Sequence, residues 1–205
     1  MATLSDLTQQ VKERVYNCPN VIIEESLNRA VRNFARETHA HTRSGTITLP
    51  AGQDEFTIVP PGDSNIVAWR MLINTRTGKE ITFVSSPYWK EVTSGSDPTL
   101  AHTADFSTIE FNAQPETDLA MKYEYALMPT YTATTVADIF VDQYGDFIAH
   151  GAQSYLLSTA GRDWYDPGSA QVALSYYREG IAMAKGIHLH TRSTASRRVF
   201  QNRFI

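Results

Sequence analysis

The chain has 205 residues, a formal net charge of −4 and 42% hydrophobic residues. This length suffices for one domain with its own hydrophobic core, and the apolar content excludes a mostly disordered chain. The negative charge argues against a protein that binds nucleic acid through a global basic surface. Cys18 is the only cysteine, which excludes an intrachain disulfide and a thiolate metal cluster. No apolar run approaches the roughly 20 residues that span a membrane, and the first ten residues lack a signal-peptide pattern, so no membrane contact is expected.

Two amphipathic helices are predicted before residue 40. Spacings of three and four residues place the apolar side chains of residues 3–16 on one helical stripe: Leu4, Leu7, Val11 and Val15. A break at Cys18-Pro19-Asn20 separates this helix from a second one, which runs to about Thr38. The second helix repeats the apolar pattern with Ile23, Leu27, Ala30, Val31 and Phe34.

The period of the apolar residues changes from helical to two from Gly45 onward, which predicts strands. Three hairpins are expected, with turns at Pro50-Ala51-Gly52, at Thr75 to Gly78 and at Gln114-Pro115-Glu116. Their paired arms are Ile47–Leu49 with Phe56–Ile58, Ile66–Ile73 with Glu80–Val84, and Thr108–Phe111 with Leu119–Leu127. Residues 85–106 are expected to be mostly a loop, with room for one helical turn. About six strands between two helical regions indicate an inserted β-sandwich or small barrel.

Helical periodicity returns over residues 138–160, and Asp166 followed by Pro167 is typical of an N-cap and first turn of a further helix. The expected fold class is α+β. Two N-terminal and two C-terminal helices would form a four-helix bundle with an inserted β-domain and an extended C-terminal tail. The predicted division is 1–40 for the first half of the bundle, 41–132 for the β-domain, 133–190 for the second half and 191–205 for the tail.

Histidines provide the best case for a metal enzyme, because His39 and His41 could meet His188 and His190 if the second helix ends near the fourth. Each pair falls at a helix end, positions two apart do not share a helical face, and no glutamate base accompanies them. No nucleophile elbow, phosphate-binding loop or dinucleotide fingerprint is present. We therefore expect no catalytic residue, no cofactor and no metal, with a small metal-dependent hydrolase as the alternative from the enzyme class.

Asp138, Asp142 and Asp146 recur at a spacing of four, which predicts an acidic stripe on one face of the third helix. The simplest interpretation is a solvated face. The alternative is a surface lining a channel for DNA, where negative charge would keep the duplex from binding.

The tail from residue 191 combines arginines with large apolar residues and has too little apolar content for a core element. Three interpretations remain open: a disordered terminus, a nucleic-acid-binding arm and a protein-docking arm. Aromatic residues with arginine are typical of interface anchors, which favours docking. The expected docking residues are Arg192, Arg197, Arg198, Phe200, Arg203, Phe204 and Ile205.

Four stretches resemble the adaptor proteins of tailed phages of the tail tubular protein A type: Asp142–Ala152, Tyr155–Leu157, Gly161–Pro167 and Tyr176–Ile181. In that family a helix ends in a short loop with a tryptophan and a proline, and a further helix closes the bundle. The order of two helices, a β-rich middle, two helices and an extended tail is also similar.

The resemblance implies a virion protein of the head-to-tail connector, made in the host cytoplasm. Twelve copies would form a ring between the portal protein and the tail nozzle or another tail protein. The helices and the tail would face the portal, and DNA would pass through at ejection without sequence-specific binding. The family has no catalytic residues. Other neck proteins, such as head-completion or tail-completion subunits, and a DNA-binding module remain alternatives.

Overall fold

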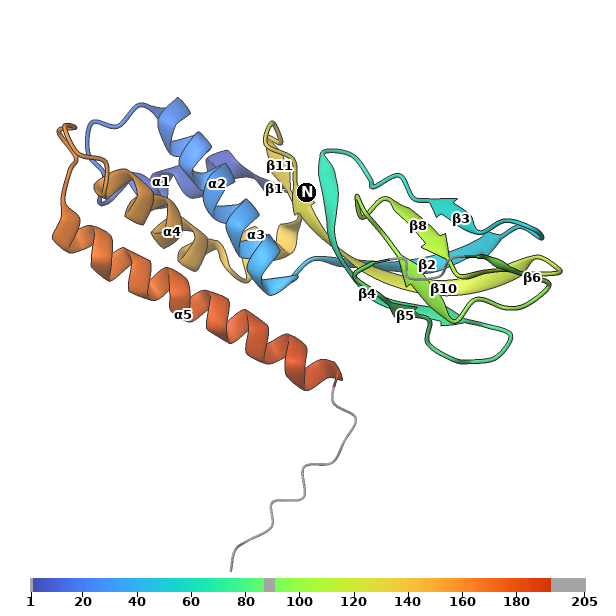
Figure 1. The fold of residues 1–205 in the computed structure, drawn as a ribbon. Helices are drawn as coiled ribbons and strands as arrows, with labels where there is room; N and C mark the ends of the chain where they lie inside the picture. The colour runs from blue at the N-terminus through green and yellow to red at the C-terminus, as the bar shows by residue number, and fades with distance from the viewer. Residues whose placement is uncertain (1, 87–90, 193–205) are drawn as a thin grey trace, which may run out of the picture.

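The computed structural model describes residues 2–86 and 91–192, and the side chains as far as residue 187. It shows an α+β chain in which a helical part and a β part lie end to end (Figure 1). The helical part is built from the two ends of the chain. The helices before the β part end with α2 at Thr38, and those after it begin with α3 at Asp138.

The helical part contains one 3₁₀ helix and five α-helices among the described residues. They are η1 (Leu4–Leu7), α1 (Thr8–Lys12), α2 (Asn20–Thr38), α3 (Asp138–Asp142), α4 (Gly145–Leu157) and α5 (Pro167–Arg192). The predicted apolar stripes of η1, α1 and α2 are buried in one core with the apolar residues of α4 and α5. Asp166 caps α5 as expected, since its carboxylate accepts hydrogen bonds from the backbone N–H and the hydroxyl of Ser169. These bonds lower the pKa of Asp166.

The prediction of a four-helix bundle is wrong, although the α+β class is consistent with the structure. The first expected helix is only a 3₁₀ turn and the five-residue α1. The third is divided into α3 and α4, because Tyr144 leaves the helical conformation at φ −126° and ψ 8°. Its ring is buried 4.9 Å from the ring of Phe34, measured between centres. This tertiary contact outweighs the helical periodicity, and α2, α4 and α5 are the long helices of the described chain.

The β part has two main sheets. The first has the order β2-β10-β4 and is antiparallel, with β2 at Thr42–Leu49, β4 at Ser64–Asn74 and β10 at Leu119–Pro129. The second has the order β3-β8-β7-β5, with β3 at Glu55–Thr57, β5 at Thr82–Phe83, β7 at Leu100–His102 and β8 at Thr108–Phe111. Both sheets contribute side chains to one core: Leu49, Leu72, Ile81, Ala101, Ile109, Phe111, Leu119 and Met121.

Two short strand pairs complete the sheets of the described chain. In one, β6 (Thr93–Ser94) pairs with β9 (Ala113–Gln114), so the segment predicted as a loop contains β6 and β7. In the other, β1 (Ala2–Thr3) pairs with β11 (Thr135–Val136) and joins the N-terminus to the segment that leads into α3.

The strand pairing differs from the first and third predicted hairpins. β2 pairs with β10 and β3 pairs with β8, so the turn at Gly52 connects strands of different sheets. The second hairpin forms next to its turn, where Ile73 pairs antiparallel with Glu80 and the Ile81 N–H donates to the Leu72 carbonyl at 2.7 Å, and β5 then pairs with β7. Likewise β8 and β10 belong to different sheets. Alternating apolar residues locate strands without specifying their partners, which are chosen by packing between distant segments.

Asn28 of α2 ties the helical part to the chain that leaves the β part. Its side-chain amide is buried and donates to the carbonyl oxygens of Ala133 at 2.9 Å and Thr130 at 3.4 Å. The two parts are therefore joined by specific hydrogen bonds as well as by the chain itself.

Candidate interaction surfaces

The expected docking tail lies almost wholly outside the described residues. Arg192 is the last residue of α5, and its side chain is not described. The other expected docking residues, Arg197, Arg198, Phe200, Arg203, Phe204 and Ile205, lie outside the described residues. The role predicted for this tail stays a prediction.

The two histidine pairs can be compared only in part, because the side chains of His188 and His190 are not described. His39 ends α2 in the left-handed conformation, with φ 52°. His41 is partly buried and packs edge-on against Phe140, with 6.0 Å between ring centres. This burial lowers the pKa of His41. Among the described residues, no three His, Cys, Asp or Glu side chains gather in a way that would hold a metal ion.

The three aspartates of the predicted acidic stripe are all exposed, but one continuous helix does not carry them. Asp138 and Asp142 belong to α3, whereas Asp146 lies in the first turn of α4, beyond the break at Tyr144. The Asp146 carboxylate accepts a hydrogen bond of 3.2 Å from the Gln10 side chain. The prediction of a single stripe down one helix is wrong because the helix is interrupted.

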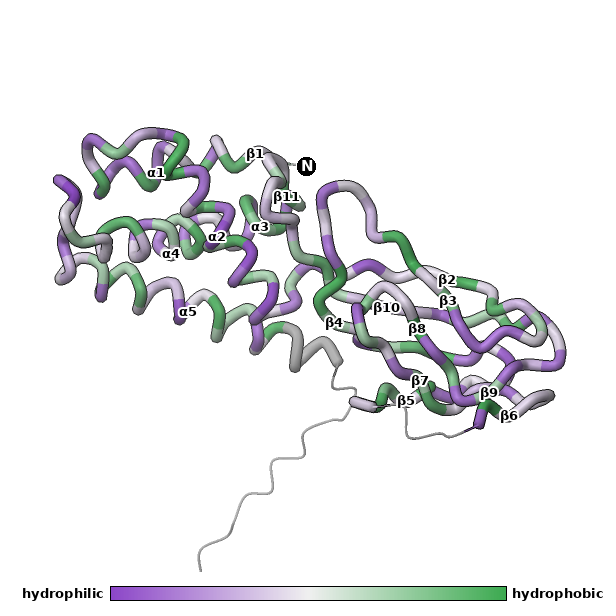
Figure 2. Tube along the Cα trace, turned by 45° about the horizontal axis from the view of Figure 1, so that its top comes forward, coloured by the Kyte–Doolittle hydropathy of each residue, from purple (hydrophilic) through white to green (hydrophobic). Residues whose placement is uncertain are grey.

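Helix α5 carries an exposed row of apolar side chains that the sequence analysis did not identify. The row consists of Val172, Tyr176, Met183 and Ile187, which are 44% to 48% exposed. The spacings of four, seven and four residues place all four on one side of the helix, at about 100° of rotation per residue. The sequence does contain a signal for this row, because these four residues repeat at helical spacing on a different face from the core residues of α5. Figure 2 shows hydrophobic and hydrophilic residues interspersed along α5.

Contacts on the other side of α5 explain why this row stays exposed. Tyr177 is 2% exposed, and its hydroxyl donates to the Ala30 carbonyl of α2 at 2.8 Å. Burial raises the pKa of Tyr177 well above its usual value. Farther along α5, Lys185 donates to Glu37 of α2 at 2.8 Å, which lowers the pKa of Glu37. These contacts fix the rotation of α5, so its apolar row cannot turn into the core of the same molecule.

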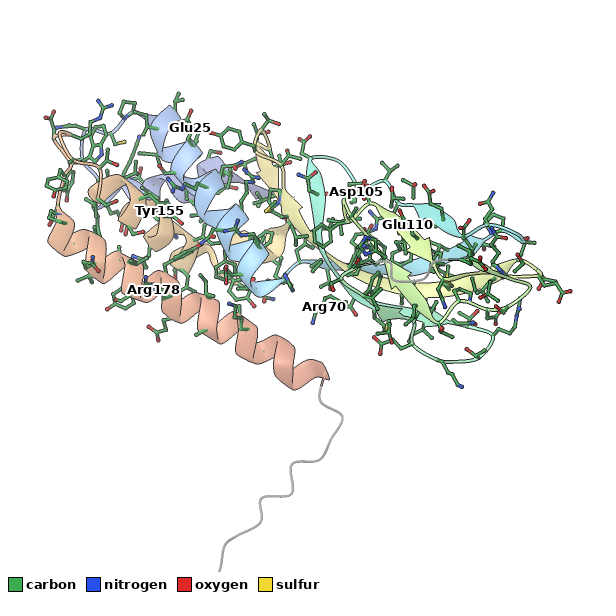
Figure 3. The ribbon with its side chains drawn as sticks, viewed as in Figure 1. Glu25, Arg70, Asp105, Glu110, Tyr155 and Arg178 are labelled. Atoms are coloured by element: carbon green, nitrogen blue, oxygen red, sulfur yellow. The ribbon has the colours of Figure 1, made fainter. Side chains whose placement is uncertain are left out.

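A groove of about 460 Å³ runs along α2, and we call it the arginine groove. Its walls come from α2, from α4 and from the chain near the end of β10: Glu25, Ser26, Arg29, Arg32, Asn33, Arg36, Met128, Tyr131 and Tyr155. The three arginines stand three and four residues apart, so they share one face of α2. Figure 3 labels Glu25 and Tyr155 at this groove, and Arg178 on α5.

Aromatic rings hold two of these guanidinium groups in place. The guanidinium carbon of Arg29 lies 4.5 Å from the centre of the Tyr155 ring, and that of Arg32 lies 5.4 Å from the centre of the Tyr131 ring. Arg36 donates a hydrogen bond of 2.9 Å to the Asn33 side-chain oxygen. Stacking of this kind leaves the N–H edges of a guanidinium group available for an acceptor.

The α5 row presents apolar side chains, and the arginine groove presents guanidinium groups. No helix within the described residues is long and apolar enough to cross a membrane. Comparison with known proteins found no family model that matches the chain and no match among curated proteins.

Proposed function

We propose that this protein is a structural subunit of a tailed-phage virion, an adaptor that forms a ring between the portal protein and the tail. The observation that carries the proposal is the exposed apolar row of α5. A row of large apolar side chains on one face of a helix is typical of a surface that a neighbouring protein covers. The protein would act by binding, without a cofactor or a catalytic residue.

The row is large enough to matter for assembly. Full burial of one such side chain contributes about 1.5–3 kcal/mol. Since nearly half of each of the four is exposed, covering all of them would contribute about 3–5 kcal/mol per subunit before the costs of association. Contacts repeated around a closed ring reinforce one another, so a modest contact in each subunit suffices for a stable ring.

The helical part and the β part would make different contacts in the connector. They lie end to end, and α5 runs along the helical part from its outer end toward the β part (Figure 1). In the connector the helical part and the tail would meet the portal, and the β part would meet the next tail protein. The exposed Asp138, Asp142 and Asp146 would face the DNA channel, where their charge would oppose binding of DNA during ejection.

Assembly with the portal protein encoded in the same genome tests the proposal. The wild-type protein should form a ring on the purified portal, seen as a mass shift in analytical ultracentrifugation and as added density in electron microscopy. Replacement of Tyr176 and Met183 by glutamate should prevent assembly, because two charges would enter the covered surface. Replacement of Ser175 and Ala182 by glutamate is the matched control, since both are exposed on α5 and have the same spacing.

The outcomes separate the proposed function from the proposed surface. If the wild-type protein does not associate with the portal at all, the connector function is wrong. If the wild-type protein assembles and the Tyr176 and Met183 variant assembles equally well, the function stands and the α5 row is not the contact. Circular dichroism should show the same helix content for both variants.

A further inference from the structure

We infer that the arginine groove is a binding site for an acidic polypeptide segment of a partner protein, whose carboxylates pair with Arg29, Arg32 and Arg36. The groove lies on α2 and α4, and the α5 row does not line it. It would therefore serve a contact that is separate from the one proposed for α5.

The state of the three guanidinium groups supports this site. None of them forms an ion pair within the described residues, although the chain has 22 acidic residues. Other cations of the described chain do find carboxylates: Arg70 with Glu124, Arg76 with Asp97 and Lys185 with Glu37. Glu25 also lines the groove, but within the described residues no ion pair joins it to an arginine. Three clustered cations against one carboxylate leave the groove with a local positive charge, which an incoming anionic segment would neutralise.

One arginine of the groove also carries an unsatisfied donor. The Nε of Arg32 is buried and has no hydrogen-bond partner in the described part of the chain. A buried donor without an acceptor costs free energy, and the cost is larger for a charged group. A carboxylate paired with the guanidinium group of Arg32 would compensate electrostatically for this unsatisfied donor.

The three guanidinium groups are also preorganised for binding. The Tyr155 and Tyr131 rings hold Arg29 and Arg32, and Asn33 holds Arg36. These contacts reduce the side-chain entropy that binding would otherwise cost. At about 1.5 Å of rise per residue, the row from Arg29 to Arg36 covers about 10 Å of α2. Carboxylates on alternate residues of an extended segment repeat at about 6.7 Å, which is close to the rise of about 6 Å from Arg32 to Arg36.

A polypeptide fits these observations better than a nucleic acid does. Proteins that bind single strands present aromatic faces on which bases stack. Here the guanidinium group of Arg29 covers a face of the Tyr155 ring, and Tyr131, which is 73% exposed, is a single open ring and not a series of rings for successive bases. The net charge of −4 also opposes the approach of a long polyanion. A short segment with a few carboxylates experiences the local charge of the groove more than that of the whole protein.

Fluorescence anisotropy with a labelled hexaglutamate peptide tests the inference, with a labelled hexathymidylate of similar charge as the competing ligand class. The wild-type protein should bind hexaglutamate, with an affinity that falls as salt is raised. The affinity of the variant Arg29→Gln with Arg36→Gln for hexaglutamate should be at least about tenfold lower, because two charge-assisted pairs are lost. Arg32 is retained in this variant because it is partly buried.

The matched control is Arg14→Gln with Arg178→Gln, which removes the same charge from two exposed positions outside the groove. Its affinity for hexaglutamate should stay close to wild type. Arg29→Lys with Arg36→Lys should show an intermediate loss, since lysine keeps the charge and loses the planar fork. Equal weakening by the groove variant and the control would overturn the inference, as would absence of hexaglutamate binding to the wild type. Tighter binding of hexathymidylate through the same arginines would identify a nucleic-acid site instead.

Discussion

The close packing of α4 against α5 makes Gly151 a sensitive position. A Cβ atom at residue 151 would lie 2.6 Å and 2.7 Å from two ring carbons of Tyr177, far inside van der Waals contact. The ring cannot move aside easily, because Tyr177 is buried and its hydroxyl is bonded to the Ala30 carbonyl. Replacement of Gly151 by alanine should therefore force α4 and α5 apart or displace the ring.

Two opposing contributions set the size of this effect. Overpacking a core by a methyl group costs about 1–3 kcal/mol. Alanine is a better helix former than glycine by about 0.5–1 kcal/mol, which offsets part of that cost. Gly186 provides the control on α5, because a Cβ there would have no neighbour within 4 Å. Gly186→Ala should raise the free energy of unfolding by about 0.5–1 kcal/mol. The free energy of unfolding of Gly151→Ala should be about 1–3 kcal/mol lower than that of Gly186→Ala.

Urea denaturation followed by circular dichroism measures both variants. The dependence of the unfolding free energy on urea should stay the same, so that the midpoints report stability directly. If Gly151→Ala and Gly186→Ala shift the midpoint by the same amount in the same direction, the close contact between α4 and Tyr177 is not present in solution.

Two further substitutions test buried hydrogen bonds. Burial raises the pKa of Tyr177, so the unfolded tyrosine loses its proton first and the native state should lose stability above about pH 10. Tyr177→Phe should flatten this alkaline decline in melting temperature and cost about 1 kcal/mol at neutral pH, and an unchanged decline would contradict the assignment. Asn28→Ala should lower the free energy of unfolding by about 1–3 kcal/mol, because the Ala133 carbonyl loses its buried donor. A urea midpoint equal to that of the wild type would show that this hydrogen bond contributes nothing to stability.

The buried faces of the helical segments were largely predictable from the sequence, although the lengths of the first and third helices were not. The stripes of Leu4 to Val15 and of Ile23 to Phe34 are buried as their spacing predicts, and α2 ends at Thr38. The cap at Asp166 was also found, because an N-cap depends on a few neighbouring residues. The acidic residues were expected on the surface, and Asp138, Asp142 and Asp146 are exposed. These features follow from local periodicity and local hydrogen bonding.

The tertiary structure decided the features that join distant residues. Alternating strands could not reveal that β10 pairs with both β2 and β4. The helical pattern over residues 138–160 could not show that the Tyr144 ring enters the core beside Phe34 and interrupts the helix. The arginine groove needs Tyr131, which is about a hundred residues away from Arg32 in the chain. Periodicity reports which side of an element is apolar, whereas its partners are chosen by packing and by the need to satisfy buried polar groups across the whole chain.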